Sequence, residues 1–462
     1  MIAAPAAAPV WRHPVTAAPL ATYLTDDAVA VERILAATQR TYEQWSRLNP
    51  VQRVAPFLRL AELLRLEMHE LAPMISGEMG KTRHEAEEEL AQCARICDHY
   101  AAVGPALLKD EEVQTRAGRH LVARCPIGPI LAVLPWSFPF WQVFRTAIPN
   151  LAAGNTVVVK PAPNVPRCSL ALEDLFVRAG MPVGALSMVH VEPGRVERLV
   201  ADPRIRGVSV TAGVVAGRAV AEAAGRHLKK VVLELGGSDP WLIMEDADLD
   251  QVAADIVKAR LRNNGQCCIG PKRVIVARAV KDALAERLVE RLTKLKFGDP
   301  LAAGVDLGPM ARFDLRDRAH EVVQEAVAKG AKVHCGGYVP ELPGAFYPAT
   351  LVSGVRPGMK LFDDEIFGPI VVLCAHDGWQ EAVALANRSD FALGAAIYTQ
   401  DEERAKKTLL TEISCGVAAI NSIPRSDMSL PFGGTKHSGF GRELGSAGLT
   451  EFTCPVTLRI GA

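Results

Sequence analysis

The sequence predicts an α/β fold made of two doubly wound α/β domains with a small additional β element. Two observations lead to this class. Residues 26–102 repeat apolar side chains at spacings of three and four, with charged residues between them, which indicates amphipathic helices. From about residue 118, short β-rich runs alternate with helical segments as far as Glu234, and the alternation then starts again. Strands that alternate with helices form parallel, doubly wound sheets.

The helical part of the chain comes first. Its three periodic segments, residues 30–45, 54–75 and 83–102, predict packing helices. The opening twenty residues are rich in alanine and proline, and prolines interrupt every apolar run. This pattern lacks the compact charged and apolar regions of a signal peptide, so we expect a flexible or extended arm.

The strands and helices that follow fall into two units that meet near residues 233–237, and we expect a ligand cleft between them. The first unit has predicted strands at 155–162, 185–191, 207–212 and 229–237, with helices at 166–180 and 217–228. The second has predicted strands at 273–277, 332–337, 369–376, 394–400 and 416–421, with helices at 250–261, 279–295, 316–331, 380–389 and 402–410.

Two further strands are expected near the edges of this arrangement. One covers residues 120–123, and the other is a terminal strand at 451–460. Either they pair with a neighbouring subunit, or they complete an edge of an internal sheet.

Composition excludes several classes of function. Lys and Arg number 52 and Asp and Glu number 52, so no net field favours nucleic acid or an anionic membrane surface. No apolar run approaches the roughly 20 residues that span a bilayer, and we expect a soluble protein. The 10 cysteines show neither CxxC pairs nor the histidine spacing of zinc sites. We therefore expect no metal, and reduced thiols in a cytoplasm.

Two adjacent cysteines, Cys267 and Cys268, lie in the segment NNGQCCIG. Free cysteine is among the most buried residue types, so both are structural core residues in one interpretation. In the other, one of them is a nucleophile, and supporting residues lie elsewhere in the chain.

Five separated segments supply that support. They are LPWSFP at 134–139, LELGG at 233–237, NNGQCCIG at 263–270, EIFGP at 365–369 and FGGTKHSGFGRE at 432–443. Together and in this order they make the chain similar to the aldehyde dehydrogenase superfamily, and most of all to its succinate semialdehyde dehydrogenase branch. The resemblance extends over essentially the whole length from about residue 20.

The resemblance implies NAD(P)-dependent oxidation of a small-molecule semialdehyde, such as succinate semialdehyde, to the acid by a homodimer or homotetramer. It also implies a Rossmann-like NAD(P)-binding domain, a catalytic domain whose C-terminal part returns toward the cofactor domain, and oligomerisation strands. The boundaries are 1–110 and 126–236 for the first, 237–447 for the second, and 111–125 with 448–462 for the strands.

In this family the last cysteine of the GQxC motif is the nucleophile, which implies that role for Cys268. A thiol adduct is needed because a free carbonyl carbon has no good way to expel hydride. Cys267 is then a packing residue or the partner of Cys268 in a reversible disulfide. Glu234 ends an apolar run, where burial raises the pKa of a carboxyl. The resemblance implies that it activates the water that cleaves the thioester; its alternative role is to cap the next element.

The chain departs from the family at Ser137. Relatives carry PWNFP, whose asparagine amide stabilises the oxyanion together with the backbone N–H of the cysteine. A serine hydroxyl is still a donor, but it is shorter, and losing one such donor typically costs about 10²- to 10³-fold in rate. Three consequences follow: a water bridges the gap between the serine and the oxyanion, catalysis is slow, or the serine is an adaptation to a particular pathway.

The cofactor residues implied by the resemblance are scattered. Lys160 corresponds to the lysine that reaches the adenosine ribose, and Pro163 replaces a glutamate found in many relatives that prefer NAD. NADP is therefore tolerated, and the choice between NAD and NADP stays open. The remaining implied contacts are Gly213 and Gly217 for the pyrophosphate, Trp136, and Glu365 and Phe367 for the nicotinamide ribose and ring.

A second departure lies in the pyrophosphate segment SVTAGVVAG, where Ala212 and Gly213 replace the Gly and Ser of the family TGSxxxG motif. One hydroxyl contact is lost and a methyl is added, so weaker cofactor binding is expected.

Substrate preference is expected to depend on two arginines. Arg145 and Arg262 occupy the positions that hold the distal carboxylate in the semialdehyde branch, where bidentate pairing selects an aldehyde with a terminal acid. Ser426 aligns with a loop serine that contacts the same carboxylate, and Phe432 belongs to the pocket wall. The alternative for either arginine is a surface salt bridge.

Two other functions remain possible from the sequence. One is a pathway-specific dehydrogenase for a different aldehyde. The other is a catalytically impaired paralogue with a binding or structural role, against which the presence of both Cys268 and Glu234 argues.

Overall fold

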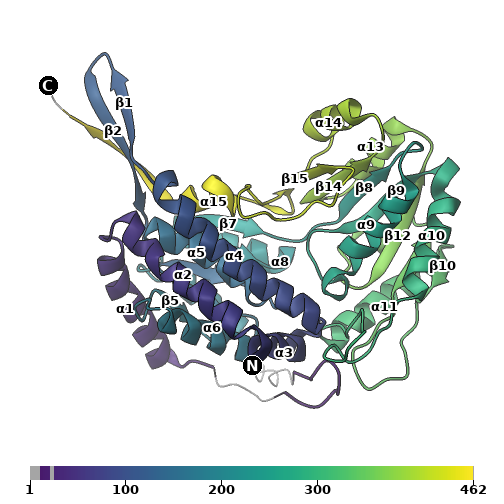
Figure 1. Cartoon of the computed structure of the whole chain (residues 1–462), viewed down its shortest axis with the longest axis horizontal. Coiled ribbons are helices and arrows are strands. Elements are labelled where there is room, and N and C mark those ends of the chain that lie inside the picture. Colours follow the sequence, from purple (N-terminus) through teal and green to yellow (C-terminus); the bar gives the residue numbers. More distant parts are fainter. Residues whose placement is uncertain (1–10, 21–24, 461–462) are drawn as a thin grey trace, which may run out of the picture.

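The structure is a computed structural model that describes residues 11–20 and 25–460. It contains two α/β units side by side, each with its own sheet, and a three-stranded sheet that projects from the body (Figure 1). The predicted α/β class is confirmed. None of the described helices is both long enough and apolar enough to cross a bilayer.

The predicted N-terminal helical region forms four helices, and its longest helix continues past the predicted end. Side chains cap three of them: Asp27 accepts from the N–H of Ala30, Thr82 accepts from that of Glu85, and Asn49 forms a capping box with Gln52. Such a cap stabilises a helix by about 1 kcal/mol. The bounds are α1 Ala28–Trp45, α2 Pro50–Leu66, α3 Met68–Met79 and α4 Arg83–Leu107.

The opening residues were expected to form a flexible or extended arm. Residues 1–10 lie outside the described part of the chain. Within 11–20, a bridge joins Arg12 to Pro19, and the carbonyl of Pro14 accepts from the N–H of Ala345 at 2.7 Å. This segment is therefore a folded turn on the second unit rather than a free arm.

The first unit contains a six-stranded sheet with the order β17-β7-β6-β3-β4-β5. Its strands are parallel except β17, which runs antiparallel to β7. From β3 the chain winds outward to β4 and β5, and later in the opposite direction to β6 and β7. The strand order thus reverses between β3 and β6, where ligands bind in doubly wound sheets. The bounds are β3 Ile130–Val133, β4 Val157–Lys160, β5 Leu186–Met188, β6 Gly207–Thr211, β7 Lys230–Glu234, β17 Gly439–Phe440, α5 Trp141–Ala153, α6 Pro166–Arg178, α7 Val196–Ala201 and α8 Val214–Arg226.

The second unit contains a seven-stranded sheet with the order β10-β11-β12-β9-β8-β14-β15. All its neighbours are parallel except β10, which pairs antiparallel with β11 at one edge. The bounds are β8 Asp239–Ile243, β9 Pro271–Ala277, β10 Lys332–Cys335, β11 Thr350–Ser353, β12 Ile370–His376, β14 Gly394–Tyr398, β15 Val417–Ile420, α9 Leu249–Leu261, α10 Lys281–Thr293, α11 Phe313–Ala328, α12 Lys360–Asp363, α13 Trp379–Asn387 and α14 Glu402–Thr411.

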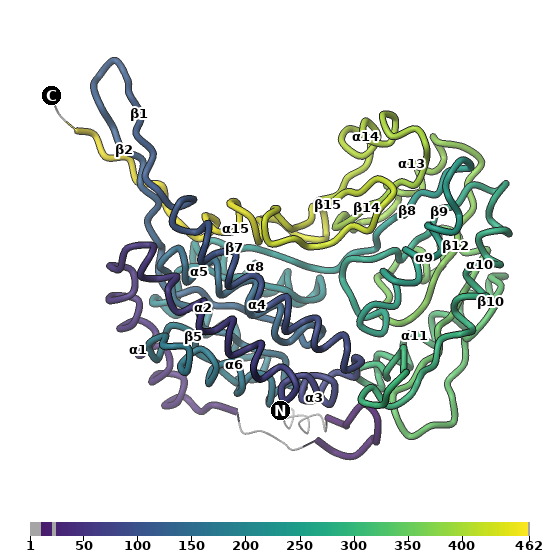
Figure 2. Tube along the Cα trace, viewed as in Figure 1, coloured from purple at the N-terminus to yellow at the C-terminus, as the bar shows by residue number. Residues whose placement is uncertain are grey.

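The chain after β15 crosses back to the first unit. Figure 2 shows this yellow segment running from the second unit along the first, and β17 pairs there with β7 through Gly439 and Glu234. This part of the chain therefore extends the sheet of the first unit by one strand. The short elements of this region are β13 Phe391–Ala392, which pairs with β16 Thr435–Lys436, and α15 Gly445–Glu451.

The projecting sheet joins the two strands that were expected near residue 120 and at the C-terminal end. β18 pairs antiparallel with β2, and β2 with β1, in the order β1-β2-β18. The terminal strand begins at Thr453 rather than at the predicted residue 451, because α15 extends to Glu451. The bounds are β1 Glu111–Thr115, β2 Gly118–Pro126 and β18 Thr453–Arg459.

Candidate active site

A cleft of about 280 Å³ lies between the two units. On one side are the carboxyl ends of β3, β6 and β7 in the first sheet. On the other side are the loops that precede β8, β9 and β12 in the second. The lining residues are Pro135, Trp136, Ser137, Gln142, Thr211, Ala212, Gly213, Glu234, Leu235, Gly236, Cys268, Leu315, Arg318, Glu365, Ile366 and Phe367.

The cysteine loop is held in an unusual backbone conformation. Asn263, Asn264 and Gly265 are consecutive residues with positive φ, at 58°, 55° and 74°, and asparagine tolerates this region better than other side chains with a Cβ. A Cβ at Gly265 would lie 2.0 Å from the carbonyl oxygen of Gly368, so the close approach requires glycine there.

Side-chain amides keep this loop in place. Nδ2 of Asn264 donates to the carbonyls of Gly80 and Pro309, both at 2.8 Å. Nδ2 of Asn263 donates to the carbonyl of Ser137 at 2.8 Å and to that of Gln266 at 2.9 Å. The Asn263 amide therefore fixes the loop before Cys268 against the segment that carries Ser137.

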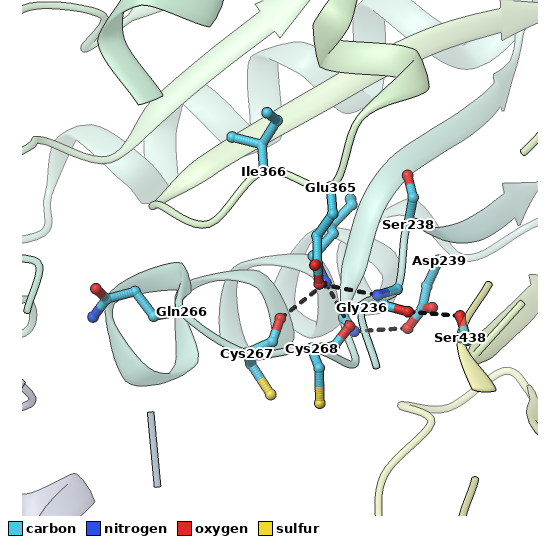
Figure 3. Close-up of polar contacts among 12 residues, drawn as sticks. Gly236, Ser238, Asp239, Gln266, Cys267, Cys268, Glu365, Ile366 and Ser438 are labelled. Carbon is cyan, nitrogen blue, oxygen red and sulfur yellow. Dashed lines mark hydrogen bonds and ion pairs between the residues drawn. The ribbon is translucent and has the colours of Figure 1, made fainter. Parts of the chain in front are cut away.

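The two thiols differ in exposure. Cys267 is buried, whereas Cys268 is half-buried and lines the cleft. Figure 3 shows both sulfur atoms pointing to the same side of the loop, away from Glu365. The two neighbouring thiols interact, which lowers the pKa of Cys267 and raises that of Cys268, so the pair loses its two protons in separate steps.

Lys272 places a positive charge directly behind both cysteines. Its side chain is 3% exposed, and Nζ donates to the carbonyl of Cys267 at 2.9 Å and also to the carbonyl of Cys268. Nζ lies 3.5 Å from Oε1 of Glu365. Cys267 and burial raise the pKa of Cys268 well above its ordinary value, and the Lys272 ammonium acts against this rise and also acts to lower the pKa of Cys267, because a nearby cation favours the thiolate.

Lys272→Met is expected to shift the pH dependence of thiol alkylation to higher pH. Thiolate is the reactive form, so removing a cation that lowers the thiol pKa requires a higher pH for the same rate. The other charged groups that face the pair, Arg145, Arg262 and Glu234, are unchanged. Iodoacetamide labelling followed by peptide mass spectrometry measures the profile. Lys272→Arg keeps the charge and is expected to stay close to wild type; equal profiles for all three proteins would contradict the role of the charge.

Glu234 is the buried carboxyl of the cleft. It ends β7, is 2% exposed, and its Oε1 has no hydrogen-bond partner among the described residues. Burial raises the pKa of this carboxyl well above its ordinary value, and the nearby Glu443 raises it further, while Arg145 and Arg442 act in the opposite direction. A carboxyl with a raised pKa and a free oxygen can act as a general base.

Ser137 follows β3, on the side of the cleft that the first unit forms. Its side chain is 6% exposed and its Oγ accepts from Nε2 of Gln142 at 3.1 Å. In the described part of the chain, no hydrogen bond uses the backbone N–H of Cys268. The cleft therefore offers a serine hydroxyl and this N–H as donors for a developing oxyanion.

The start of α8 fits a phosphate group. Its N-cap is Gly213, which makes no side-chain cap, so the N–H groups of the first helical turn are not satisfied by a side chain. A Cβ at Gly213 would meet nothing within 4 Å, which leaves room in front of the helix. Gly217 has a different role: a Cβ there would lie 2.4 Å from Cδ2 of Leu235. It does not line the cleft, and it is needed for close packing of α8.

The other predicted cofactor residues divide into two groups. Trp136, Glu365 and Phe367 line the cleft, and the rings of Trp136 and Phe367 meet edge to face at 6.1 Å. Glu365 accepts from the N–H of Gly237 at 2.9 Å. Lys160 ends β4 outside this lining, 7% exposed, and burial lowers its pKa against the opposing effect of Glu192.

None of the predicted substrate residues lines the cleft. Arg145 is 4% exposed and forms a buried ion pair with Glu443, while its Nη2 donates to Oγ1 of Thr211 at 3.2 Å. Its guanidinium also lies 5.0 Å from the ring of Phe432, which is 2% exposed. The surface salt bridge considered for Arg145 is thus replaced by a buried one.

Arg262 is less constrained. It is half-buried, lies 5.2 Å from the ring of Phe138, and its Nη2 is 3.5 Å from Oε1 of Gln92. Ser426 is half-buried and lies in the loop before Phe432. Arg145 is therefore paired with a carboxylate, whereas Arg262 forms no ion pair within 4.0 Å among the described residues.

Three residues of the site were not assigned from the sequence: Gln142, Lys272 and Glu443. Glu443 ends the quoted segment FGGTKHSGFGRE, so the motif contained the residue without indicating its partner. Lys272 follows Cys268 by four residues, and Gln142 follows Ser137 by five. The only signal for these two was proximity to a motif.

Comparisons with known proteins show the family of this chain. Residues 8–457 match the Aldehyde dehydrogenase family. The chain is 41% identical to a probable succinate-semialdehyde dehydrogenase (NADP⁺) of Synechocystis, covering 97% of this chain and 98% of that one. It is 39% identical to a succinate semialdehyde dehydrogenase (NAD(P)⁺) of Escherichia coli, covering 98% of each. The crystal structure of succinic semialdehyde dehydrogenase from Streptococcus pyogenes in complex with NADP⁺ is 32% identical, with a TM-score of 0.94 over 98% of this chain and 100% of that one. This chain therefore belongs to the aldehyde dehydrogenase family.

Proposed function

We propose that this protein oxidises a semialdehyde of the succinate semialdehyde type to the acid, with NAD or NADP as the hydride acceptor. The observation that carries the proposal is that one cleft brings together Cys268, Glu234, Ser137 and Glu365 from four separate segments. The names of the relatives support the substrate class and the use of NADP⁺. The impaired-paralogue alternative is disfavoured because both the thiol and the carboxyl line the cleft.

Each of these residues has a separate role in the proposed reaction. Cys268, next to Cys267 and with Lys272 behind it, supplies the thiolate that attacks the carbonyl carbon, so that the carbonyl π electrons move to the oxygen. Donors at Ser137 and the N–H of Cys268 stabilise that oxygen. When bound, NAD(P)⁺ accepts the hydride. Glu234 then takes a proton from the water that cleaves the thioester, and the thiol leaves with the acid as product.

The cofactor would be held by groups of the first unit and by one loop of the second. The first turn of α8, beginning after Gly213, offers backbone N–H groups to a pyrophosphate. Lys160, at the end of β4, would contact the adenosine ribose, and Glu365 the nicotinamide ribose. Pro163 provides no carboxylate that would repel a 2′-phosphate, so NADP is accepted.

The terminal carboxylate of the substrate is assigned mainly to Arg262. Arg145 already pairs with the carboxylate of Glu443, and a buried guanidinium in such a pair has little charge left for a second anion. Arg262 has no ion pair of its own among the described residues within 4.0 Å, and its ring contact with Phe138 leaves part of the guanidinium open. Ser426 and Phe432 would complete the pocket.

Initial rates with succinate semialdehyde, using NAD and NADP in parallel, test the function. We expect kcat/KM for succinate semialdehyde to exceed that for an uncharged aldehyde of similar length. Arg262→Leu should remove most of this preference, about 10-fold or more, because a charge-assisted hydrogen bond contributes about 1.5–3 kcal/mol.

The control for this experiment is the uncharged aldehyde, whose rate should change little in Arg262→Leu. A wild-type protein that prefers the uncharged aldehyde would instead support a pathway-specific dehydrogenase for another substrate. No oxidation of any aldehyde would overturn the function.

We also propose that the protein is a cytoplasmic homo-oligomer that assembles through the sheet β1-β2-β18. This sheet projects from the body (Figure 1), and its last strand exposes the apolar side chains of Val456 and Leu458. All 10 cysteines are free thiols, which suits a reducing compartment. Light scattering of the full chain against a chain that ends after Phe452 separates a dimer or tetramer from a monomer.

A further inference from the structure

The side chain proposed as the oxyanion donor differs in this chain from that of the family. Ser137 replaces the family asparagine, and its hydroxyl reaches less far than an amide. Directly beside it, Gln142 is 4% exposed, lines the same cleft, and leaves its Oε1 without a partner among the described residues. A buried amide whose oxygen has no partner costs free energy, so its presence in a folded protein requires an explanation.

The hydrogen bond between the two side chains has a defined direction. The Gln142 amide nitrogen has only hydrogens to offer, so Nε2 donates and Oγ of Ser137 accepts, at 3.1 Å. The hydroxyl hydrogen must then point away from Gln142. Both residues line the cleft with Cys268, so the open direction for this hydrogen is into the cleft.

The backbone around the pair is rigid. The N–H groups of Phe140 and Trp141 donate to Oε1 of Glu89 at 2.8 and 2.9 Å, and Glu89 is paired with the fully buried Lys81. The N–H of Gln142 donates to the carbonyl of Phe138 at 3.0 Å. The first turn of α5 therefore cannot shift easily, and Asn263 holds Ser137 from the other side.

We propose that Gln142 is a positioning residue that orients the Ser137 hydroxyl as an oxyanion donor, and that the Ser137–Gln142 pair takes the place of the family asparagine. The amide polarises the hydroxyl, since a hydroxyl that accepts a hydrogen bond is a stronger donor. The inference rests on the proposed roles of Cys268 and Ser137. On this inference, Gln142 compensates for the serine at position 137, so the loss of the family asparagine does not slow catalysis.

Gln142→Glu is the sharpest test. The carboxylate introduced there has nearly the same shape but only accepts, so it would draw the Ser137 hydrogen out of the cleft. We expect the first-turnover rate of NAD(P)H formation to fall about 10²-fold, as when one oxyanion donor is removed. The rate of Cys268 alkylation at a pH where the thiol is fully ionised should stay within about twofold of wild type.

A double-mutant cycle separates orientation from a structural effect. Ser137→Ala should lower the same rate by about 10²-fold, and Gln142→Leu by a smaller factor. The variant with both changes should be no slower than Ser137→Ala, because Gln142 acts only through the hydroxyl. In Ser137→Asn, which has its own amide, Gln142→Leu should cost little.

The inference is wrong if Gln142→Glu and Gln142→Leu both keep the wild-type first-turnover rate, or if the losses from Ser137→Ala and Gln142→Leu multiply. Multiplied losses with a lowered melting temperature would indicate a purely structural Gln142. Failure of the proposed function is recognised separately, because the wild-type protein itself would then oxidise no aldehyde.

Discussion

Replacing Cys268 by alanine is expected to reduce aldehyde oxidation on the order of 10⁴- to 10⁶-fold, as removal of an enzyme nucleophile does. Without the sulfur no tetrahedral adduct forms, and the hydride has no route out of the carbonyl compound. Initial rates of NAD(P)H formation measure the loss. Equilibrium binding of NADP should be unchanged, because the groups proposed to hold the cofactor, at α8 and Glu365, are intact.

The matched control is the adjacent Cys267→Ala. Cys267 is buried and does not line the cleft. Because it raises the pKa of Cys268, its loss is expected to shift the pH profile to lower pH while activity remains. The assignment of the nucleophile would be reversed if Cys267→Ala were inactive and Cys268→Ala active. Mass spectrometry of the acyl adduct identifies the labelled peptide and distinguishes the two positions.

The elements that could be read from the sequence are those with a local pattern. The amphipathic repeat of residues 26–102 predicts α1 to α4, and the apolar runs that end at Lys160, Thr211 and Glu234 predict the buried strands of the first sheet. Strand β8 was missed, since it begins with Asp239 and a proline, which are depleted in strands. Helix α5 was also not predicted: it is buried along its whole length, polar side chains included, and it contains Pro149, which is unfavourable inside a helix.

The site residues divide in the same way: a contiguous motif predicts some of them, and the others depend on contacts between distant parts of the chain. Cys268 and Glu234 lie within contiguous motifs, and the structure places both in one cleft. The partner of Arg145 is Glu443, nearly three hundred residues further along the chain, and no local pattern predicts such a pair. Gly217 was assigned to the cofactor because of its motif, whereas its contact with Leu235 depends on how closely a helix packs on a strand.

Glu234→Gln is expected to separate the two halves of the reaction. One equivalent of NAD(P)H per active site should form in a burst, and the steady-state rate should then be lower by about 10²- to 10⁴-fold, the usual contribution of a general base. The amide cannot take a proton from water, so the thioester on Cys268 persists. Rapid mixing measures the burst, and intact-protein mass spectrometry detects the acyl group.

The pH dependence of the steady-state rate provides a second test of this prediction. Burial and Glu443 raise the pKa of the Glu234 carboxyl, against Arg145 and Arg442, and only the ionised form accepts a proton. The steady-state rate of the wild type should therefore rise with pH through that raised pKa, and Glu234→Gln should lose this rise. A variant with no burst would place Glu234 before hydride transfer, in deprotonation of the thiol, whereas a full burst followed by wild-type turnover would exclude it as the base. Because Arg145 and Lys272 act to lower the pKa of the Cys268 thiol without help from Glu234, we expect the full burst and the slow second phase.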